Sequence, residues 1–301
     1  MVGKSEKQDS EKKNDSGKTK LIIATIIVVV IIAAVALFAL GVFGGAESVA
    51  VLSLQGGTVQ VDTGSGWTQA TDGMGLSLGN KVKTLSDGMA ALVIYDSTVI
   101  MLEPETEITL ENLDKEGLKI YQSAGATWNK FSGIVGVDGM TVETPNTVAT
   151  VRGTEFFITT DSLMVTEGQV DTNISGVSFL VGEFETVVLV DGVPVKREMN
   201  AEEKAFAARK ISEYVNQMKN ARQAEIEKYR PLLDLAKQNY GFDEEQINTS
   251  IAAVDNGEFA VEELDVLAKE NGIDQIIDYP KLRKLTVEIV EANKRIKRLL
   301  E

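Results

Sequence analysis

Acidic side chains are the most abundant groups in this sequence that could do chemistry. The chain has 45 Asp and Glu residues against 30 Lys and Arg, and it contains neither His nor Cys. These absences exclude Ser-His-Asp and Cys-His nucleophilic sites, zinc sites built on imidazole or thiolate, iron–sulfur clusters and disulfides. Catalysis would therefore have to depend on carboxylates, Lys, Ser, Thr or Tyr.

Known catalytic and cofactor motifs are missing as well. A glycosidase needs two positioned carboxylates, and nothing in the pattern marks a pair, so a carboxylate-dependent hydrolase of envelope glycans is a minor alternative. There is no GxxxxGK[ST] and no GxGxxG that opens a helix. We expect no catalytic residues and no cofactor.

One stretch, "AAVDNGEFAVEE", has a faint likeness to a calcium-binding loop. Gly257, Phe259 and Glu263 fall at suitable relative positions, but Ala252 and Val254 then stand where ligand oxygens are required. The sequence therefore predicts no metal site at this loop.

Charge is distributed unevenly along the chain. The formal net charge is −15, and residues 44 to 198 hold 21 acidic and 8 basic residues, a net charge of −13. Because phosphate binding needs clustered Lys and Arg, we expect no nucleic-acid partner. A solvated acidic surface is the simplest interpretation of this region, and a cationic partner or divalent ions are the alternative.

An uncharged apolar run, "LIIATIIVVVIIAAVALFALGVF", extends from Leu21 to Phe43. As a helix it would be about 35 Å long, enough to cross a hydrocarbon core of about 30 Å. It predicts a single transmembrane helix. A cleaved signal peptide is the rival interpretation, because Gly44 and Ala46 are small enough for a signal peptidase site, although signal-peptide apolar regions are usually shorter.

The flanks of this run predict its orientation. Residues 1–20 contain six lysines, whereas the residues after Phe43 have no base until Lys81. The positive-inside rule then places the N-terminus in the cytoplasm and the rest of the chain outside, with the lipid bilayer as one partner. The polar segment 1–20 has too few apolar residues to fold, so we expect a disordered cytoplasmic tail.

Residues 48–198 have the pattern of an all-β domain. Short alternating segments such as "TVQVDT", "LKIYQSAG" and "ETVVLVDG" are separated by turns rich in Gly, Asp and Asn. The fold class is therefore mainly β, as a roll, a sandwich or a solenoid-like arrangement of strands. Trp67 and Trp128 are expected to be core or sheet-covering aromatic residues.

After residue 198 the period changes to that of helices, over residues 199–301. Asn200 and Glu203 have the spacing of a capping box at the start of a long amphipathic helix, which Pro231 should kink or end. Shorter helices are predicted at 243–254, 260–271 and 280–300. Their apolar stripes favour a small bundle, or a helix docked on the β domain, over a groove for a partner.

The stretch "VETPNTVATVRGTEFFITTD", Val142 to Asp161, is followed by "VTEGQVDT". Together they resemble the signature of the FecR-type domain, and upstream segments such as "LGNKVKTLSDGMAALVIYDSTVIMLEPET" agree with the first half of that domain. The resemblance covers about residues 49 to 175. The motif residues, which we interpret as mainly architectural, are Thr144, Pro145, Arg152, Gly153, Thr154, Phe156 and Gly168.

Arg152 is the least expected of these residues, because it falls within an apparent strand. In a half-buried strand it would need an acidic partner, and the nearest acids in sequence are Glu143, Glu155 and Glu167. We therefore expect a charge pair that sets strand register. Gly153 would allow a bulge or a close backbone approach beside it, and the Thr144–Pro145 step would end the preceding strand.

The resemblance implies a regulatory role. FecR-type proteins are membrane-spanning regulators in which an outer domain receives a signal and an inner domain controls a sigma factor. In this chain the inner segment is expected to be too short to fold as that inner domain. We therefore expect a non-catalytic extracytoplasmic module that binds an envelope protein or glycan, assembles, or receives a signal; the alternative is a transmembrane regulator acting through a cytoplasmic partner.

Overall fold

The chain forms a β-rich part followed by helices. The computed structural model describes residues 50–95, 98–114, 117–131, 138–228, 230, 244–270 and 279–301. Contacts divide the chain into two compact units, with the boundary after Ala207. We call Gly45–Ala207 the β unit and Ala208–Glu301 the helical unit, and each is described by itself.

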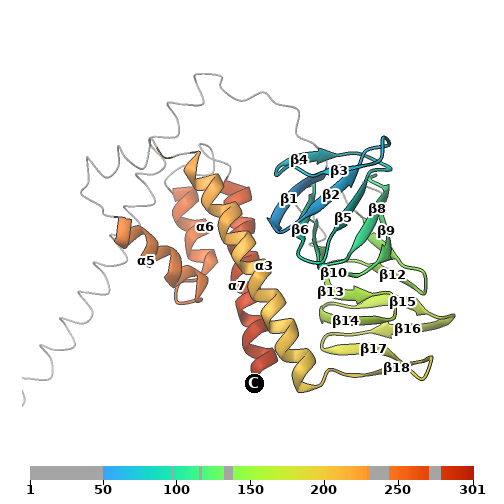
Figure 1. Ribbon diagram of the computed structural model, residues 1–301. Coiled ribbons are helices and arrows are strands. Elements are labelled where there is room, and N and C mark those ends of the chain that lie inside the picture. Colours follow the sequence, from blue (N-terminus) through green and yellow to red (C-terminus); the bar gives the residue numbers. More distant parts are fainter. Residues whose placement is uncertain are drawn as a thin grey trace, which may run out of the picture. The chain divides into compact units, whose positions relative to one another are not determined.

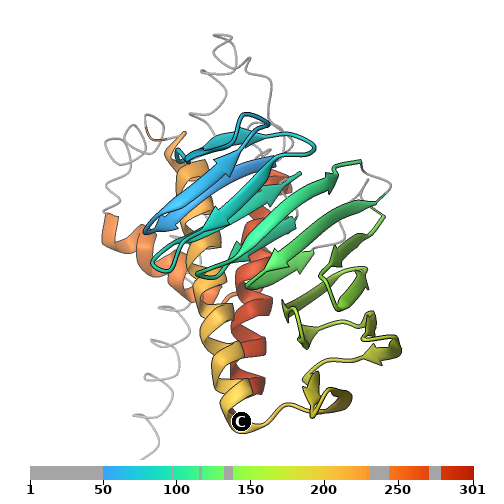
Figure 2. The same cartoon turned by 45° about the vertical axis from the view of Figure 1, so that its right-hand side comes forward.

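The β unit contains two nine-stranded sheets. In Figure 2 the colour of the strands passes from blue through green to yellow along the unit. Sheet I has the order β18-β17-β14-β13-β10-β7-β6-β1-β4. Its strands are β1 (Ala50–Gly56), β4 (Met74–Leu76), β6 (Met89–Ile94), β7 (Thr98–Leu102), β10 (Ala126–Phe131), β13 (Thr154–Thr159), β14 (Ser162–Glu167), β17 (Glu185–Val190) and β18 (Val193–Glu198).

Sheet II has the order β16-β15-β12-β11-β9-β8-β5-β2-β3. Its strands are β2 (Val59–Asp62), β3 (Trp67–Gln69), β5 (Lys81–Thr84), β8 (Glu107–Asn112), β9 (Leu118–Ala124), β11 (Met140–Glu143), β12 (Thr147–Val151), β15 (Val170–Ile174) and β16 (Val177–Val181). Every strand pair in the described ranges is antiparallel except β9 with β11, which is parallel. The expected mainly β class is confirmed, as a sandwich-like pair of sheets.

The core lies between the two sheets. Sheet II strands alternate buried and partly exposed residues, as in β2 and β11, because one face packs on the core and the other meets solvent. The core takes residues from both sheets, among them Leu92, Ile100, Phe131 and Phe156 from sheet I. This alternation is the period-two pattern that identified the strands in the sequence.

Sheet I differs because both of its faces are buried in the middle of the sheet. Every residue of β7 is buried, and so is nearly every residue of β10 and β13. The outer face carries Trp128 and Phe157, which are opposite each other in register. Phe206, from the second turn of the helix that follows β18, packs edge-on against Phe157 with ring centroids 4.9 Å apart. The expectation of a buried Trp128 is confirmed, whereas Trp67 is partly exposed on edge strand β3.

The helices are α3 (Ala201–Glu227), α5 (Glu244–Asp255), α6 (Val261–Glu270) and α7 (Tyr279–Leu300), drawn in orange to red in Figure 1. Their bounds lie close to the predicted ranges. In the helical unit, α7 contacts both α5 and α6. Tyr214 of α3 also donates to Glu288 of α7 over 3.4 Å. The helices therefore pack on one another as the small-bundle prediction requires.

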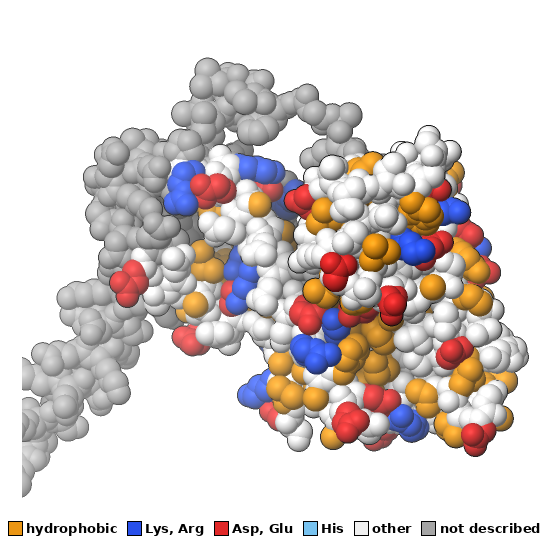
Figure 3. Space-filling model, viewed as in Figure 1, with side chains coloured by type: hydrophobic (Ala, Val, Ile, Leu, Met, Phe, Trp, Pro, Cys, Tyr) orange, Lys and Arg blue, Asp and Glu red, His pale blue; other side chains and the backbone are white. Residues whose placement is uncertain are grey.

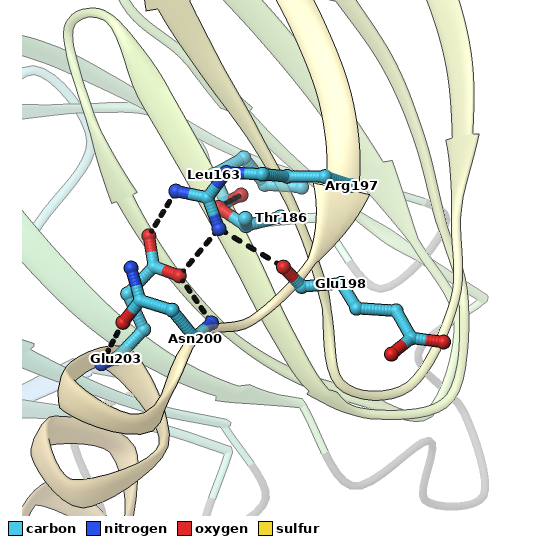
Figure 4. A network of polar contacts seen from close by, with 6 residues as sticks. All are labelled: Leu163, Thr186, Arg197, Glu198, Asn200 and Glu203. Carbon is cyan, nitrogen blue, oxygen red and sulfur yellow. Dashed lines mark hydrogen bonds and ion pairs between the residues drawn. The ribbon is translucent and has the colours of Figure 1, made fainter.

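The start of α3 has the predicted capping box. The amide of Glu203 donates to Asn200 Oδ1 (2.9 Å), and the amide of Asn200 donates to Glu203 Oε2 (2.8 Å), as Figure 4 shows. Arg197 adds a two-pronged ion pair, with Nη1 and Nη2 at 2.7 and 2.8 Å from the Glu203 carboxylate. The Arg197 hydrogen bonds hold the pKa of Glu203 below its ordinary value. This network fixes the junction between the last strand and the first helix.

A buried ion pair joins two helices of the helical unit. Arg222 of α3 donates from both terminal nitrogens to the Asp255 carboxylate at the end of α5, at 2.7 and 2.9 Å. Lys219 lies 3.3 Å from the same carboxylate, and Asn293 of α7 donates to the backbone carbonyl of Asp255. Asp255 therefore connects three helices.

Several expectations concern residues outside this description. The transmembrane helix at 21–43, the tail at 1–20 and the helix break at Pro231 lie outside the described residues. Within the described ranges, no helix combines the length and apolarity needed to cross a bilayer.

Candidate functional site

The Thr-Pro step ends a strand, as predicted. β11 stops at Glu143, and the amide of Thr144 donates to the carbonyl of Thr147 over 2.7 Å to close a tight turn. Thr144 Oγ1 accepts the amide of Thr147 at 2.9 Å and that of Asn146 at 3.3 Å. Pro145 is exposed at the turn, where its lack of an N–H costs no ladder hydrogen bond. Thr144 therefore acts as a structural residue.

The same turn is tied to the other sheet. Thr147 Oγ1 donates to the carbonyl of Thr160 at 3.2 Å. Asn146 Nδ2 donates to Asp161 Oδ1 at 2.8 Å. Thr160 and Asp161 form the turn between β13 and β14 of sheet I, whereas the Thr144 turn belongs to sheet II. These bonds join the two layers of the sandwich at one end.

Arg152 and Gly153 form the connection from β12 in sheet II to β13 in sheet I. Gly153 has φ +59° and Gly168 has φ +77°, conformations that favour glycine. A Cβ on Gly168 would lie 2.7 Å from the Gly153 carbonyl oxygen and 2.8 Å from Thr154 Cγ2. The close approach expected of Gly153 is not made by that residue, because nothing lies within 4 Å of a Cβ placed on it; Gly168 is the residue that permits the close contact. A register shift follows on β13, between Glu155 and Phe156.

The expected ion pair of Arg152 is wrong. Arg152 is exposed, and its Nε donates to the backbone carbonyl of Asp138 at 2.9 Å. The acids considered as partners, Glu143, Glu155 and Glu167, all bond elsewhere. The physical reason is that β12 ends at Val151, so Arg152 lies in a crossover turn and its side chain is not directed into the core.

Two of these acids instead bond to side chains of sheet I. Glu155 is fully buried and accepts a hydrogen bond from Trp128 Nε1 at 2.9 Å. Buried Lys130, which is opposite Glu155 in register, pairs with Glu167. A charge pair that helps to set register therefore exists beside the motif, but Lys130 supplies the cation.

A hollow of about 820 Å³ opens beside Arg152, on the outer side of sheet II. Its floor is one cross-strand row on five neighbouring strands, in which each residue is opposite the next in register. The members of this row are Lys119, Thr141, Thr150, Asp171 and Leu180. We call this feature the Arg152 hollow.

Comparisons with known proteins identify the segment that contains the motif. Residues 80–173 match the family model described as FecR protein, and all seven motif residues lie inside that range. We refer to residues 80–173 as the FecR domain. No curated protein matches the chain.

Solved structures with some likeness to the chain were also found. Two are crystal structures of "a putative anti-sigma factor" from Parabacteroides distasonis ATCC 8503. The first has 16% identity and a TM-score of 0.37 and covers 42% of this chain; the second has 15% identity and a TM-score of 0.38 and covers 46%. This chain spans 63% of the first structure and 72% of the second.

Lys119 and Arg152, two basic side chains that line the Arg152 hollow, differ in the partners they have. Lys119 Nζ lies 2.7 Å from Glu143 and 2.9 Å from Glu111, and these hydrogen bonds raise its pKa above the ordinary value. Arg152 makes only the bond to the Asp138 carbonyl among the described residues, and it makes that bond through Nε. No described residue bonds to its two terminal nitrogens, which a guanidinium presents as a planar fork.

No metal site is formed by the described part of the FecR domain or of the helices. No group of three or more acidic side chains there is placed to hold an ion. In the stretch that resembles a calcium loop, Asp255 is instead held by Arg222.

Sequence reasoning found the motif residues but missed the hollow. Its floor joins residues up to 61 positions apart, from Lys119 to Leu180, through the parallel pairing of β9 with β11. The alternation within each strand indicates which residues face outward. It does not indicate which strands are neighbours.

Proposed function

We propose that the FecR domain is a non-catalytic module that binds an envelope partner or receives a signal on the outer side of the membrane, held there by residues 21–43. The observation that carries this proposal is the Arg152 hollow. Arg152 stands at its edge with two terminal guanidinium nitrogens that have no partner among the described residues.

The polar character of sheet II supports a binding role. The strands of sheet II alternate, so one of their faces is at least partly open to solvent, in contrast to the centre of sheet I. The floor of the hollow combines hydroxyl, carboxylate, ammonium and apolar groups. A floor of this mixed kind can form hydrogen bonds with the polar groups of a protein or glycan partner and can also bury some of the partner's apolar surface.

The exposure of Arg152 supports recognition over architecture. An exposed Arg with one backbone hydrogen bond adds little to stability. The same side chain is well suited to a carboxylate or a planar amide on a partner, because it can donate two parallel hydrogen bonds.

A photo-reactive amino acid placed in the hollow of the full-length chain tests the proposal in intact cells. Gln169 is exposed and lines the hollow, whereas Leu78 is exposed in a turn outside it and serves as the matched control position. We expect the probe at Gln169 to capture a defined envelope component that the probe at Leu78 does not capture. An added Arg152→Ala substitution should strongly reduce that capture.

Equal capture at the two positions, or capture that is unaffected by Arg152→Ala, would contradict the binding role of the hollow. The topology is tested separately. Protease added to sealed cells should digest the FecR domain and leave a small N-terminal fragment, and complete protection of the domain would contradict an outer location.

The second candidate function is a transmembrane regulator of FecR type, which passes a signal inward through a cytoplasmic partner. The FecR match at residues 80–173 favours it. A cytoplasmic regulator that co-purifies with residues 1–20, and is lost when those residues are deleted, would support this function. Capture of envelope components alone would favour the binding module.

A further inference from the structure

The outer face of sheet II carries a row of side chains that crosses five strands and has an aromatic residue at each end. Each member of the row is opposite the next in register, so all of them lie on one face of the sheet. From β3 to β9 the row consists of Trp67, Asp62, Lys81, Thr109 and Tyr121, all of them at least partly exposed. We call this feature the Trp67–Tyr121 row.

The two aromatic side chains present both ring surface and an unused polar atom. Trp67 is 38% exposed, and Lys83 Nζ lies 5.6 Å from the centroid of its ring, a cation–π contact that orients the ring without covering it. Among the described residues, neither the Trp67 indole N–H nor the Tyr121 hydroxyl has a hydrogen-bond partner. Exposed aromatic residues with a free polar atom are typical of binding surfaces.

The distance between the two rings indicates the shape of a ligand. Strands β3 and β9 are four strand spacings apart in sheet II. At about 4.8 Å for each spacing, Trp67 and Tyr121 are about 19 Å apart along the sheet. Rings this far apart cannot enclose one small molecule together. Each ring can instead contact a separate unit of an extended ligand that lies across the strands, such as a sugar of a polysaccharide.

Polar groups occupy the surface between and beside the rings. Lys81 and Thr109 lie between them in the row, and the amide side chains of Gln60 and Gln69 are opposite each other in the next row. Both Gln side chains are at least partly exposed. Hydroxyl and amide groups both donate and accept hydrogen bonds, as sugar hydroxyls do. The sheet faces of OB-fold barrels also bind oligosaccharides.

The charges on this part of sheet II balance. Lys83 lies 3.3 Å from Glu107, and Lys81 is directly opposite Asp62. On the face of the β unit seen in Figure 3, acidic and basic side chains lie among uncharged ones. Residues 44–198 as a whole have a net charge of −13, which repels an anionic chain. The balanced row offers a cationic chain no excess of acid, so the charges favour an uncharged ligand.

We propose that the Trp67–Tyr121 row is a binding site for an extended, uncharged polysaccharide. Sugar rings stack on Trp67 and Tyr121 through the C–H groups of their flat faces, and sugar hydroxyls bond to the polar side chains between them. A protein partner fits less well, because protein interfaces gather their aromatic anchors near the centre of the patch, whereas these rings stand at the two ends of a polar row. The proposal rests on the proposed function for the outer location of the β unit, and it adds a second site with a defined class of ligand.

Calorimetric titration of the full-length chain, in a detergent without a sugar headgroup, tests the site. The probes are β-1,4-linked hexasaccharides of glucose and of N-acetylglucosamine, which are long enough to reach both rings. We expect at least one of them to bind, and Trp67→Ala or Tyr121→Ala to weaken that binding roughly tenfold or more. Trp67→Phe and Tyr121→Phe keep an aromatic ring and should retain most of the affinity.

Arg152→Ala is the matched control, and it should leave hexasaccharide binding unchanged because Arg152 lies outside the row. Loss of the envelope capture at the hollow together with intact hexasaccharide binding would therefore contradict the proposed function of the hollow and support the polysaccharide site. Absence of binding by both hexasaccharides, or equal affinity of the wild type and Trp67→Ala, would overturn the polysaccharide site. A loss of affinity in Arg152→Ala as large as that in Trp67→Ala would also overturn it.

Tryptophan fluorescence provides an independent readout. Trp128 is fully buried, so quenching by acrylamide reports mainly on Trp67. Saturating hexasaccharide should protect Trp67 from the quencher. A hexasaccharide of galacturonic acid, which is anionic, should bind roughly tenfold more weakly or not at all. Unchanged quenching at saturation, or binding of the anionic chain that is equally tight or tighter, would overturn the proposal.

Discussion

A Cβ atom on Gly168 would lie 2.7 Å from the carbonyl oxygen of Gly153. Real Cβ atoms do not approach backbone oxygens so closely, so the β14–β15 turn can lie against the β12–β13 crossover only when residue 168 is glycine. Arg152 lies in this crossover, so Gly153 and Gly168 together help to determine its position.

Gly168→Ala should strongly destabilise the β unit. The positive φ and the backbone clash together should lower the free energy of unfolding by about 2–4 kcal/mol. Both Trp residues lie in the β unit, so urea unfolding of the full-length chain followed by Trp fluorescence reports on this unit. Gly192→Ala is the matched control, because Gly192 has a positive φ but open space around it. Gly192→Ala should lower the free energy of unfolding by about 1 kcal/mol. An equal loss of stability in the two variants would contradict the close contact at Gly168.

Arg152→Ala should leave the same unit almost unchanged. The side chain is exposed and, among the described residues, makes one hydrogen bond, to the Asp138 carbonyl, so the change in unfolding free energy should stay within about 0.5 kcal/mol. Trp fluorescence in urea again measures this. A loss above about 2 kcal/mol would show that Arg152 is architectural after all and would weaken its proposed role in recognition.

Stability should depend on pH through Glu203. Hydrogen bonds from Arg197 lower the pKa of Glu203 below its ordinary value. A carboxyl with a lowered folded-state pKa stabilises the fold above its unfolded pKa, and this contribution is lost as pH falls through the folded pKa. Glu203→Gln keeps the capping box but removes the charge. It should cost about 0.5–1 kcal/mol at pH 7, and the difference from wild type should shrink as pH falls below about 4.5. A difference that stays constant from pH 7 to pH 3 would argue against the Arg197 pair as its source.

The Arg222–Asp255 pair should control the stability of the helical unit. Arg222→Met leaves a buried carboxylate with Lys219 as its remaining cation, and it should cost about 3 kcal/mol. Thermal unfolding followed by far-ultraviolet circular dichroism measures the helical signal. Arg209→Met is the control, because its contact with Glu213 is exposed and 4.0 Å long; it should cost less than about 0.5 kcal/mol. Comparable losses for the two variants would contradict the importance of the buried pair.

The local features of this protein follow from its sequence. Thr144 and Pro145 end a strand, and Asn200 and Glu203 cap a helix, because these effects depend on residues a few positions apart. Hydrophobic periodicity alone also predicts the change from strands to helices near residue 200 and the approximate bounds of α5, α6 and α7. The FecR motif was recognisable for the same reason, since its members lie within one short segment.

The role of Arg152 depended on tertiary structure. Its neighbours in sequence predicted a position inside a strand and an acidic partner. The chain instead crosses between the sheets at Arg152, and the nearby Glu167 forms its ion pair with Lys130. The parallel pairing of β9 with β11 creates the floor of the Arg152 hollow, and the order of the strands leaves β16 at an edge. Strand neighbours are chosen by packing between residues far apart in the chain, and no local period encodes that choice.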